Sequence, residues 1–301
     1  MKAALLRRPD VLMVITSAPA YVATAEVIKV VSPLNLTPLR FLLSALVLGS
    51  YFLITKRRIV LRPPNAPRVF GIVILGYGVY VTLLNLGQST VSAGTTSMLV
   101  NTAPVFAFIL ARVFLKERTS RVGLIGLATA VLGTVIVTLS GSTALGFDRN
   151  ALLIVAAALA LGIFLILQQP VFAAIPPVEL VFWGCLVGGL ATLPFADFNI
   201  HLETWAPSTH VALAVLVIFS TVLACTYWNI SLAATSVATG GSLLFAIPVF
   251  SVVLGWLLLG QVPSTGAILG GAIALGGVAI LGRQGTVNRA NAPHEPDVKC
   301  T

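Results

Sequence analysis

Ten long apolar runs constrain the fold of this chain more than any other feature of its sequence. Each run has about 20 residues, the helical length that crosses the hydrocarbon core of a bilayer. Only 9% of the residues are charged, far below the roughly one quarter typical of soluble domains. The sequence therefore predicts an all-α membrane protein with ten transmembrane helices. The predicted spans are 11–31, 34–55, 68–88, 92–115, 121–140, 150–169, 178–196, 210–231, 235–259 and 263–282.

The positions of Lys and Arg predict how these spans are oriented. If the N-terminus lies inside, 15 of the 18 basic residues fall in the N-terminal segment, the second and fourth loops, or the tail. All of these segments would face the cytoplasm, where short loops carry an excess of positive charge. The bias predicts that both termini are cytoplasmic. It also accounts for the net charge of +9 without a nucleic-acid partner.

The second half of the chain repeats the first at a shift of 144 residues. Residues 82–141 align with their counterparts without a gap, and Pro104 meets Pro248. Because a unit of five spans is odd, the second copy must cross the membrane in the opposite direction. The loop charges agree, since the basic residues after the fourth span have no basic counterpart after the ninth. Opposed repeats of this kind are typical of secondary transporters.

The repeat divides the chain into four parts. The first five-helix repeat covers residues 1–141 and the second covers 150–282, with a Gly- and Ser-containing linker at 142–149. The polar tail, residues 283–301, is predicted to be cytoplasmic and disordered. No cysteines have metal-ligand spacing, and no Walker A motif is present, so we expect no cofactor and no metal.

Three stretches resemble the EamA-type domains of the drug/metabolite transporter superfamily. They are residues 104–133, their echo at 248–277, and Lys29 with Pro33 and the Leu39-Arg40-Phe41 motif. The resemblance covers nearly the whole chain and implies a ten-helix carrier with two EamA-type domains in the cell inner membrane. It further implies transport of small metabolites, often amino acids or related compounds, and often export.

Three charged side chains fall within the first two spans, namely Glu26, Lys29 and Arg40. Each costs roughly 2.5–3.5 kcal/mol at the centre of a membrane helix. Glu26 and Lys29 share a helix face, and Arg40 is expected at a similar depth in the next span. One hypothesis is a charged vestibule of Lys29 and Arg40 that binds a zwitterionic or anionic substrate, with Glu26 binding substrate or exchanging a proton. The alternative is a structural ion pair or triad near the interface.

Polar and aromatic residues near the bilayer midplane are further candidates for substrate binding. Tyr21, Tyr77 and Tyr80 offer rings with polar tips, and Asn101 is a buried amide that needs partners. For each tyrosine the alternative role is packing, and for Asn101 it is a hydrogen bond to a neighbouring helix.

Pro104 and Pro248 occupy equivalent positions in spans four and nine. Each removes one helix hydrogen bond, so both are predicted to bend their helices. The bends either help the two halves rock or are fixed kinks needed for packing.

The opposed repeats predict a secondary transporter that works by alternating access. The resemblance implies that its substrate is a small polar metabolite, an amino acid or related compound, and that the expected direction is export. The alternative is a flippase-like carrier of a lipid-linked substrate. An enzyme is not expected, because there is no HExxH motif and Glu26 is the one acidic residue well inside a predicted span. The expected partners are a small-molecule substrate and the lipid bilayer, with the chain acting as a monomer or homodimer.

Overall fold

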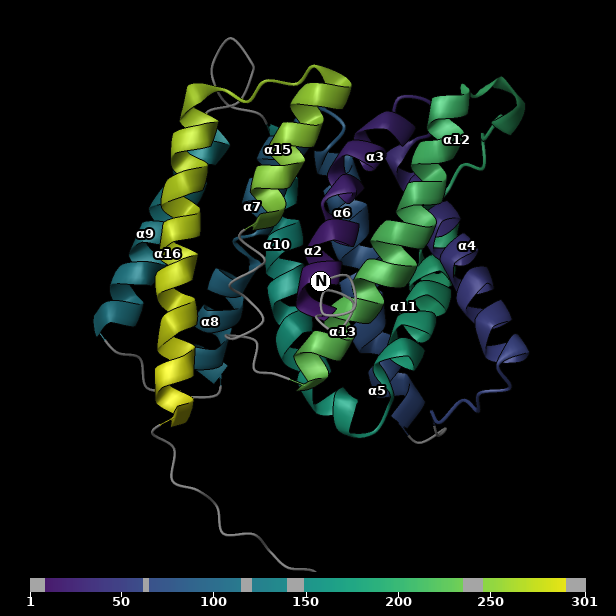
Figure 1. Ribbon diagram of the computed structural model, residues 1–301, viewed down its shortest axis with the longest axis horizontal. Helices are drawn as coiled ribbons and strands as arrows, with labels where there is room; N and C mark the ends of the chain where they lie inside the picture. Colours follow the sequence, from purple (N-terminus) through teal and green to yellow (C-terminus); the bar gives the residue numbers. More distant parts are fainter. Residues whose placement is uncertain (1–8, 62–64, 115–120, 140–148, 235–245, 291–301) are drawn as a thin grey trace, which may run out of the picture.

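The computed structural model describes residues 9–61, 65–114, 121–139, 149–234 and 246–290. Every regular element within these ranges is helical, which confirms the all-α class. The helices stand side by side in one bundle (Figure 1), with α9 (Arg121–Leu139) and α16 (Thr265–Ala290) at one edge and α4 (Pro33–Ile54) at the other.

Helices of the first half begin and end near the predicted boundaries. Several predicted spans consist of two or three consecutive elements, because the helix is interrupted or changes its hydrogen-bond pattern. Besides α4 and α9, the first half contains α2 (Pro9–Ser17), α3 (Pro19–Val27), α5 (Ala66–Val73), the π-helix η2 (Ile74–Val79), α6 (Tyr80–Gly87), α7 (Ala93–Val100) and α8 (Ala103–Phe114).

The second half has the same character. Its elements, besides α16, are α10 (Arg149–Gln168), η3 (Gln169–Ala173), α11 (Pro177–Thr192), η4 (Leu193–Phe195), η5 (Leu202–Thr204), α12 (Pro207–Ala214), the π-helix η6 (Val215–Leu223), α13 (Ala224–Ala234) and α15 (Ala246–Leu259). The helix α16 continues to Ala290, so the tail predicted from residue 283 begins as helix. The rest of that tail and residues 142–148 of the predicted linker lie outside the described residues, whereas Arg149 already belongs to α10.

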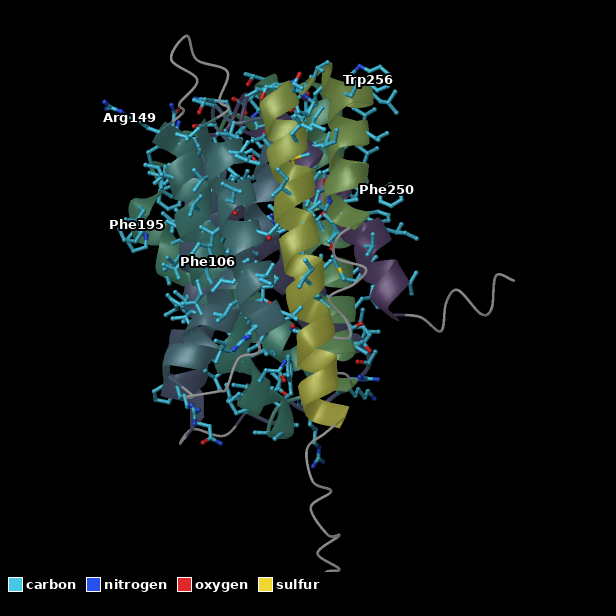
Figure 2. The ribbon with its side chains drawn as sticks, turned by 90° about the vertical axis from the view of Figure 1, so that its left-hand side faces the viewer. Phe106, Arg149, Phe195, Phe250 and Trp256 are labelled. Carbon is cyan, nitrogen blue, oxygen red and sulfur yellow. The ribbon has the colours of Figure 1, made fainter. Side chains whose placement is uncertain are left out.

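Large apolar side chains cover the outside of the bundle. Five helical stretches are long and apolar enough to cross a membrane, and four shorter apolar helices accompany them within the described ranges. Figure 2 shows Phe250 and Trp256 pointing away from α15, and more than half of each side chain is exposed. Such a surface suits lipid, where exposing apolar atoms has no hydrophobic cost. The five stretches are Pro33–Ile54, Ala66–Gly87, Arg149–Ala173, Pro177–Phe195 and Pro207–Leu232.

The helices α4 and α11 are joined at both ends. In what we call the Asn35 clamp, the Asn35 side chain accepts from the backbone N–H of Asp197 at 3.0 Å and donates to the Asp197 carboxylate. In the Glu179 clamp, the Glu179 carboxylate accepts from the backbone N–H groups of Val60 and Leu61, each at 2.8 Å. The Asn35 clamp joins the start of α4 to the segment that follows α11, and the Glu179 clamp joins the start of α11 to the segment that follows α4. The two helices are therefore antiparallel neighbours.

The helices α9 and α16 pack closely through glycines. A Cβ atom on Gly133 would lie 2.2 Å from the backbone nitrogen of Ala274 and 2.6 Å from the carbonyl oxygen of Gly270. A Cβ atom on Gly126 would lie 3.0 Å from the carbonyl oxygen of Gly277. Small residues at these positions allow two backbones to approach, which is how helices associate in lipid.

Candidate functional site

A cavity of about 200 Å³ lies within the bundle. It is lined from both halves of the chain, by α2, α3, α4, η2, α6, α7, α8, α10, η6, α13 and α15. Apolar side chains make up most of the wall, with a small number of polar groups among them. This combination is typical of small-molecule sites, and the volume lies below the range for drug-sized ligands.

Six of the residues singled out in the sequence contribute to this wall. The structure brings together the three tyrosines and the candidate amide, with one charged residue and one proline. They are Tyr21, Tyr77, Tyr80, Asn101, Arg40 and Pro104. These residues come from four different predicted spans and meet at one cavity, while their predicted role in substrate binding stays a prediction.

Arg40 is the charged group of the cavity. Its side chain is 7% exposed, and it donates from Nε to the Thr221 hydroxyl at 2.7 Å and from Nη2 to the Ser220 carbonyl at 3.2 Å. Its guanidinium carbon lies 5.5 Å from the centre of the Phe41 ring. None of these partners is a carboxylate, and the Nη1 group takes part in neither hydrogen bond. A buried positive charge held by neutral groups attracts an anion.

The π-helix η6 explains why acceptors are available for Arg40. A π-helix is wider than an α-helix, and its looser hydrogen bonding leaves carbonyl groups open to other donors. Within η6, Thr221 donates to the Leu216 carbonyl at 2.8 Å. The Ser44 hydroxyl on α4 makes its shorter hydrogen bond to the Arg40 carbonyl at 2.8 Å and also lies 3.4 Å from the Val217 carbonyl of η6. Arg40 and Ser44 lie one turn apart on α4, so one face of α4 supplies donors to η6.

Tyr77 lies in the other π-helix, η2, and is held by close packing. Cβ atoms on Gly184 and Gly188 of α11 would lie 2.5 Å and 2.7 Å from Tyr77 atoms, so these glycines form the groove that receives it. Its ring also makes edge contacts with Phe41 at 5.5 Å and Phe164 at 5.9 Å between centroids. Tyr77 is therefore a fixed part of the wall.

Asn101 and Pro104 mark an interruption between α7 and α8. The helix leaves regular geometry at Asn101 and Thr102, and Pro104 sits in the first turn of α8, where its missing N–H costs little. The Asn101 side chain donates to the Ser97 carbonyl at 2.8 Å, which the Asn101 backbone N–H also contacts at 3.2 Å. The Asn101 side chain thus forms a hydrogen bond within its own helix and also lines the cavity.

Glu26 and Lys29 lie outside the cavity, contrary to the hypothesis of one charged vestibule with Arg40. They form an ion pair with each other, and Ser208 at the start of α12 donates to Glu26 at 3.4 Å. The Lys29 side chain is 58% exposed. The reason is orientation around the helix, because Tyr21 and Thr24 turn inward while Glu26 and Lys29 face the α12 side.

Pro248 also lies outside the cavity lining, in the first turn of the described part of α15. Its neighbour Ile247 lines the cavity instead. Residues 235–245 lie outside the described residues, so a bend of this helix at Pro248 stays a prediction.

Trp228 and Asn229 are cavity residues that the sequence analysis assigned no binding role. For Trp228, the repeat contained the signal that could have found it. Adding 144 to Tyr80, Val81 and Leu84 gives Ala224, Cys225 and Trp228, and all six of these positions line the cavity.

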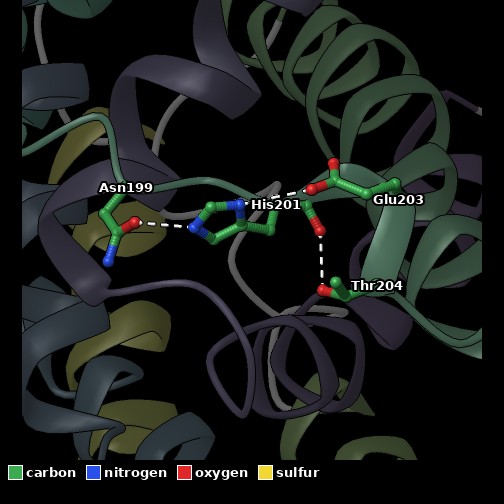
Figure 3. A network of polar contacts seen from close by, with 4 residues as sticks. All are labelled: Asn199, His201, Glu203 and Thr204. Atoms are coloured by element: carbon green, nitrogen blue, oxygen red, sulfur yellow. Dashed lines mark hydrogen bonds and ion pairs between the residues drawn. The ribbon is translucent and has the colours of Figure 1, made fainter.

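The loop before α12 holds a separate polar network (Figure 3). His201 contacts the Asn199 amide oxygen at 2.9 Å and the Glu203 carboxylate at 3.2 Å, and its carbonyl accepts from the Thr204 hydroxyl at 2.8 Å. A hydrogen bond from its own backbone N–H and the His201 contact lower the pKa of Glu203. The groups are exposed and lie away from the cavity, and no metal-binding cluster occurs among the described residues.

Apolar helices around a cavity of small-molecule size, with a buried cationic group in its wall, define the chain as a helical membrane protein. The chain belongs to the EamA-like transporter family, whose sequence profile matches residues 11–139 and 149–283. This confirms the resemblance, with the two matched segments in the two predicted repeats.

Several relatives are transporters by name. A probable terminal-alkyne amino-acid exporter from Streptantibioticus cattleyicolor is 31% identical over 218 residues, covering 72% of this chain and 73% of that protein. The uncharacterized transporter YdfC of Bacillus subtilis is 27% identical over 252 residues, covering 82% and 81%. One solved structure aligns over 91% of this chain and 95% of its own, with a TM-score of 0.67 and 22% identity, and supports the fold alone.

Proposed function

We propose that this protein is a secondary transporter that exports a small carboxylate-bearing metabolite, an amino acid or related compound, by alternating access. The observation that carries the proposal is the buried guanidinium of Arg40, which faces the cavity without a carboxylate partner among the described residues. A planar guanidinium fork matches a carboxylate in two parallel hydrogen bonds. The relative named as a probable amino-acid exporter supports the same substrate class.

In the proposed binding mode, Arg40 holds the carboxylate while the other lining residues surround the rest of the molecule. Tyr21, Tyr77 and Tyr80 supply aromatic faces, and the Asn101 amide supplies a polar contact. The cavity volume of about 200 Å³ suits a small metabolite better than a lipid-linked carrier. Lys29 and Glu26 form an outer ion pair that takes no part in binding.

The proposed architecture is ten spans in two inverted repeats. The antiparallel neighbours α4 and α11 support it, because they begin at Pro33 and Pro177, which differ by the same 144 residues as the sequence repeat. The π-helix η2 likewise maps onto the last six residues of η6. Transporter sites lie near the midplane at the interface between such repeats.

In the proposed orientation, both termini are cytoplasmic and the protein resides in the cell inner membrane. Lys56, Arg57 and Arg58, which follow α4, and Arg68 in α5 would lie inside, as the excess of basic residues in cytoplasmic loops requires. The interruption at Pro104 and the predicted bend at Pro248 would allow the halves to rock around the cavity.

A survival screen tests the function. Cells that overproduce the protein would be challenged with toxic amounts of amino acids and related acids, and survival would be compared with that of cells carrying Arg40→Gln. We expect protection against a subset of carboxylates, lost in Arg40→Gln. Lys29→Gln is the matched control, because it removes the same charge outside the cavity and should keep protection. Protection against no compound, or equal protection by Arg40→Gln, would contradict the proposal.

A further inference from the structure

The charge of the cavity wall points to a narrower substrate class. Among the described residues that line the cavity, Arg40 alone carries a formal charge. Residues 235–245, which adjoin this region in the chain but lie outside the described part, contain no Asp or Glu. The described wall therefore presents a single positive charge.

We propose that the cavity selects small apolar monocarboxylates with a net charge of −1, such as 2-oxo and 2-hydroxy acids, over the corresponding zwitterionic amino acids. The inference rests on the proposed function, because it concerns the same cavity. A monoanion paired with Arg40 makes the occupied site neutral, which is the favourable state for charges removed from water. A bound zwitterion would leave its ammonium group without an anionic partner.

The neutral groups of the wall offer that ammonium only weak compensation. The rings of Tyr21, Tyr80 and Trp228 offer cation–π contacts, and the uncharged side chains of Ser17, Thr24, Asn101 and Asn229 offer polar ones. These contacts are weaker than the pairing that a buried ammonium needs to offset its lost hydration. Glu26 does not supply it, because it pairs with Lys29 outside the cavity. The remaining described carboxylates with assigned contacts, Glu179, Asp197 and Glu203, are likewise engaged elsewhere.

The neutral partners of Arg40 strengthen the argument. Thr221 and the Ser220 carbonyl orient the guanidinium without neutralising it and each take one N–H, from Nε and from Nη2. One N–H of Nη1 and the second N–H of Nη2 can then form two parallel bonds to a carboxylate. A dianionic phosphate would bring one negative charge more than the site can balance. Apolar residues such as Leu84, Leu161 and Ile247 then favour an aliphatic or aromatic remainder.

Export of a monoanion has an energetic consequence. The inside-negative membrane potential drives anions outward, so the carrier would export them without proton coupling. Transport of a zwitterion moves no net charge and would not respond to the potential. The two substrate classes therefore differ in a measurable way.

The test uses the purified full-length protein in liposomes and compounds matched in their side chains. Flux of L-leucine would be compared with that of 4-methyl-2-oxopentanoate, and of L-phenylalanine with that of phenylpyruvate, with potentials set by potassium and valinomycin. We expect each oxo acid to move at least about tenfold faster than its amino acid, with flux that rises when the potential drives anions out. Faster amino-acid flux, or oxo-acid flux indifferent to the potential, would overturn the inference.

A second variant reverses the charge balance. Asn101→Asp adds a carboxylate to the wall, while the Ser97 carbonyl keeps its bond from the backbone N–H of residue 101. We expect the ratio of amino-acid to oxo-acid flux to rise about tenfold, and an unchanged ratio would count against the inference. If neither class moves in the wild type, the inference fails. The survival screen then decides separately whether the proposed export function stands.

Discussion

Arg40 and Glu179 are both charged and both buried, yet their surroundings differ completely. Glu179 is 1% exposed and accepts hydrogen bonds from the Val60 and Leu61 backbones and from the Trp183 ring N–H at 3.2 Å. Arg40 is 7% exposed, has neutral acceptors for part of its guanidinium, and faces the cavity.

The difference separates a structural charge from a charge available to a ligand. Donors surround Glu179 and leave no room for another partner, so its contribution is to hold α4 and α11 together. Arg40 has N–H donors that pair with no acceptor in the described part of the chain, and under the proposed function the free-energy cost of leaving them unpaired is offset when an anion binds. Burial alone therefore does not identify a functional charge, whereas the set of partners does.

Arg40→Lys should have the largest effect, and it tests whether Arg40 serves a ligand or only the structure. Lysine keeps the charge but cannot reach Thr221 and Ser220 while presenting a fork to a carboxylate. We expect transport to fall by at least about tenfold, equivalent to losing one charged hydrogen bond, with little change in melting temperature. Counterflow in liposomes and thermal unfolding in detergent measure the two quantities. Full transport together with a large drop in melting temperature would assign Arg40 to structure instead.

Glu179→Gln should give the opposite result. The amide cannot accept from Val60 and Leu61 as the carboxylate does, and we expect a loss of about 1–3 kcal/mol in stability. Transport per folded molecule should stay unchanged, as measured by counterflow normalised to folded protein. Glu203→Gln is the matched control, since it removes the same charge from an exposed loop and should leave the melting temperature unaltered. Lost transport with intact stability would give Glu179 a direct role.

Glu26→Gln extends the comparison of Arg40 and Glu179 to a third charged residue, which is neither buried nor in the cavity. Its ion pair with Lys29 is exposed to solvent, and such pairs contribute at most about 1 kcal/mol. We expect less than a twofold change in both net flux and counterflow. Selective loss of proton-driven uptake with normal counterflow would restore Glu26 as a proton carrier.

The smallest expected effect is a loss of stability at low pH, caused by protonation of Asp197 in the Asn35 clamp. The hydrogen bond from Asn35, with a further one from the Asn199 backbone, lowers the pKa of Asp197. A lowered pKa means that the clamp contributes stability above the ordinary aspartate pKa of about 3.9 and loses it as the pH falls through the lowered value. Thermal unfolding against pH should show this small acid loss, and Asp197→Asn should abolish that component. An identical acid response in Asp197→Asn would exclude Asp197 as its source.

Apolar length and charge were enough to predict the helical class, because backbone groups in lipid have to be hydrogen-bonded internally. Helix ends were predicted less well, since α16 runs to Ala290, beyond the predicted end of its span at residue 282. Reasoning about polar groups near the midplane also selected Tyr21, Tyr77, Tyr80 and Asn101, which line the cavity, whereas Arg40 was expected in a vestibule with Lys29 and Pro104 as a helix bend. The sequence also predicted the family resemblance that the sequence profile confirms.

The sequence could not separate Glu26 from Arg40, because depth in the membrane does not reveal which side of a helix faces the core. It gave no role to Glu179, which lies at the edge of a predicted span and finds its partners 118 and 119 positions away. The π-helices η2 and η6 have no residue pattern that marks them. They follow from contacts, such as those of Ser44 and Arg40 with η6, that form only in the assembled bundle.

The two clamps also determine when folding can finish during synthesis, because each clamp joins residues that are made far apart in time. Val60 and Leu61 are synthesised long before Glu179, which accepts from their backbone N–H groups. Asn35 is likewise synthesised 162 positions before its partner Asp197. The first half of the chain is therefore made before the carboxylates of Glu179 and Asp197 that bind its polar groups. Maturation has to end with a late docking step of the second half, and halves expressed as separate chains should be stable only when made together.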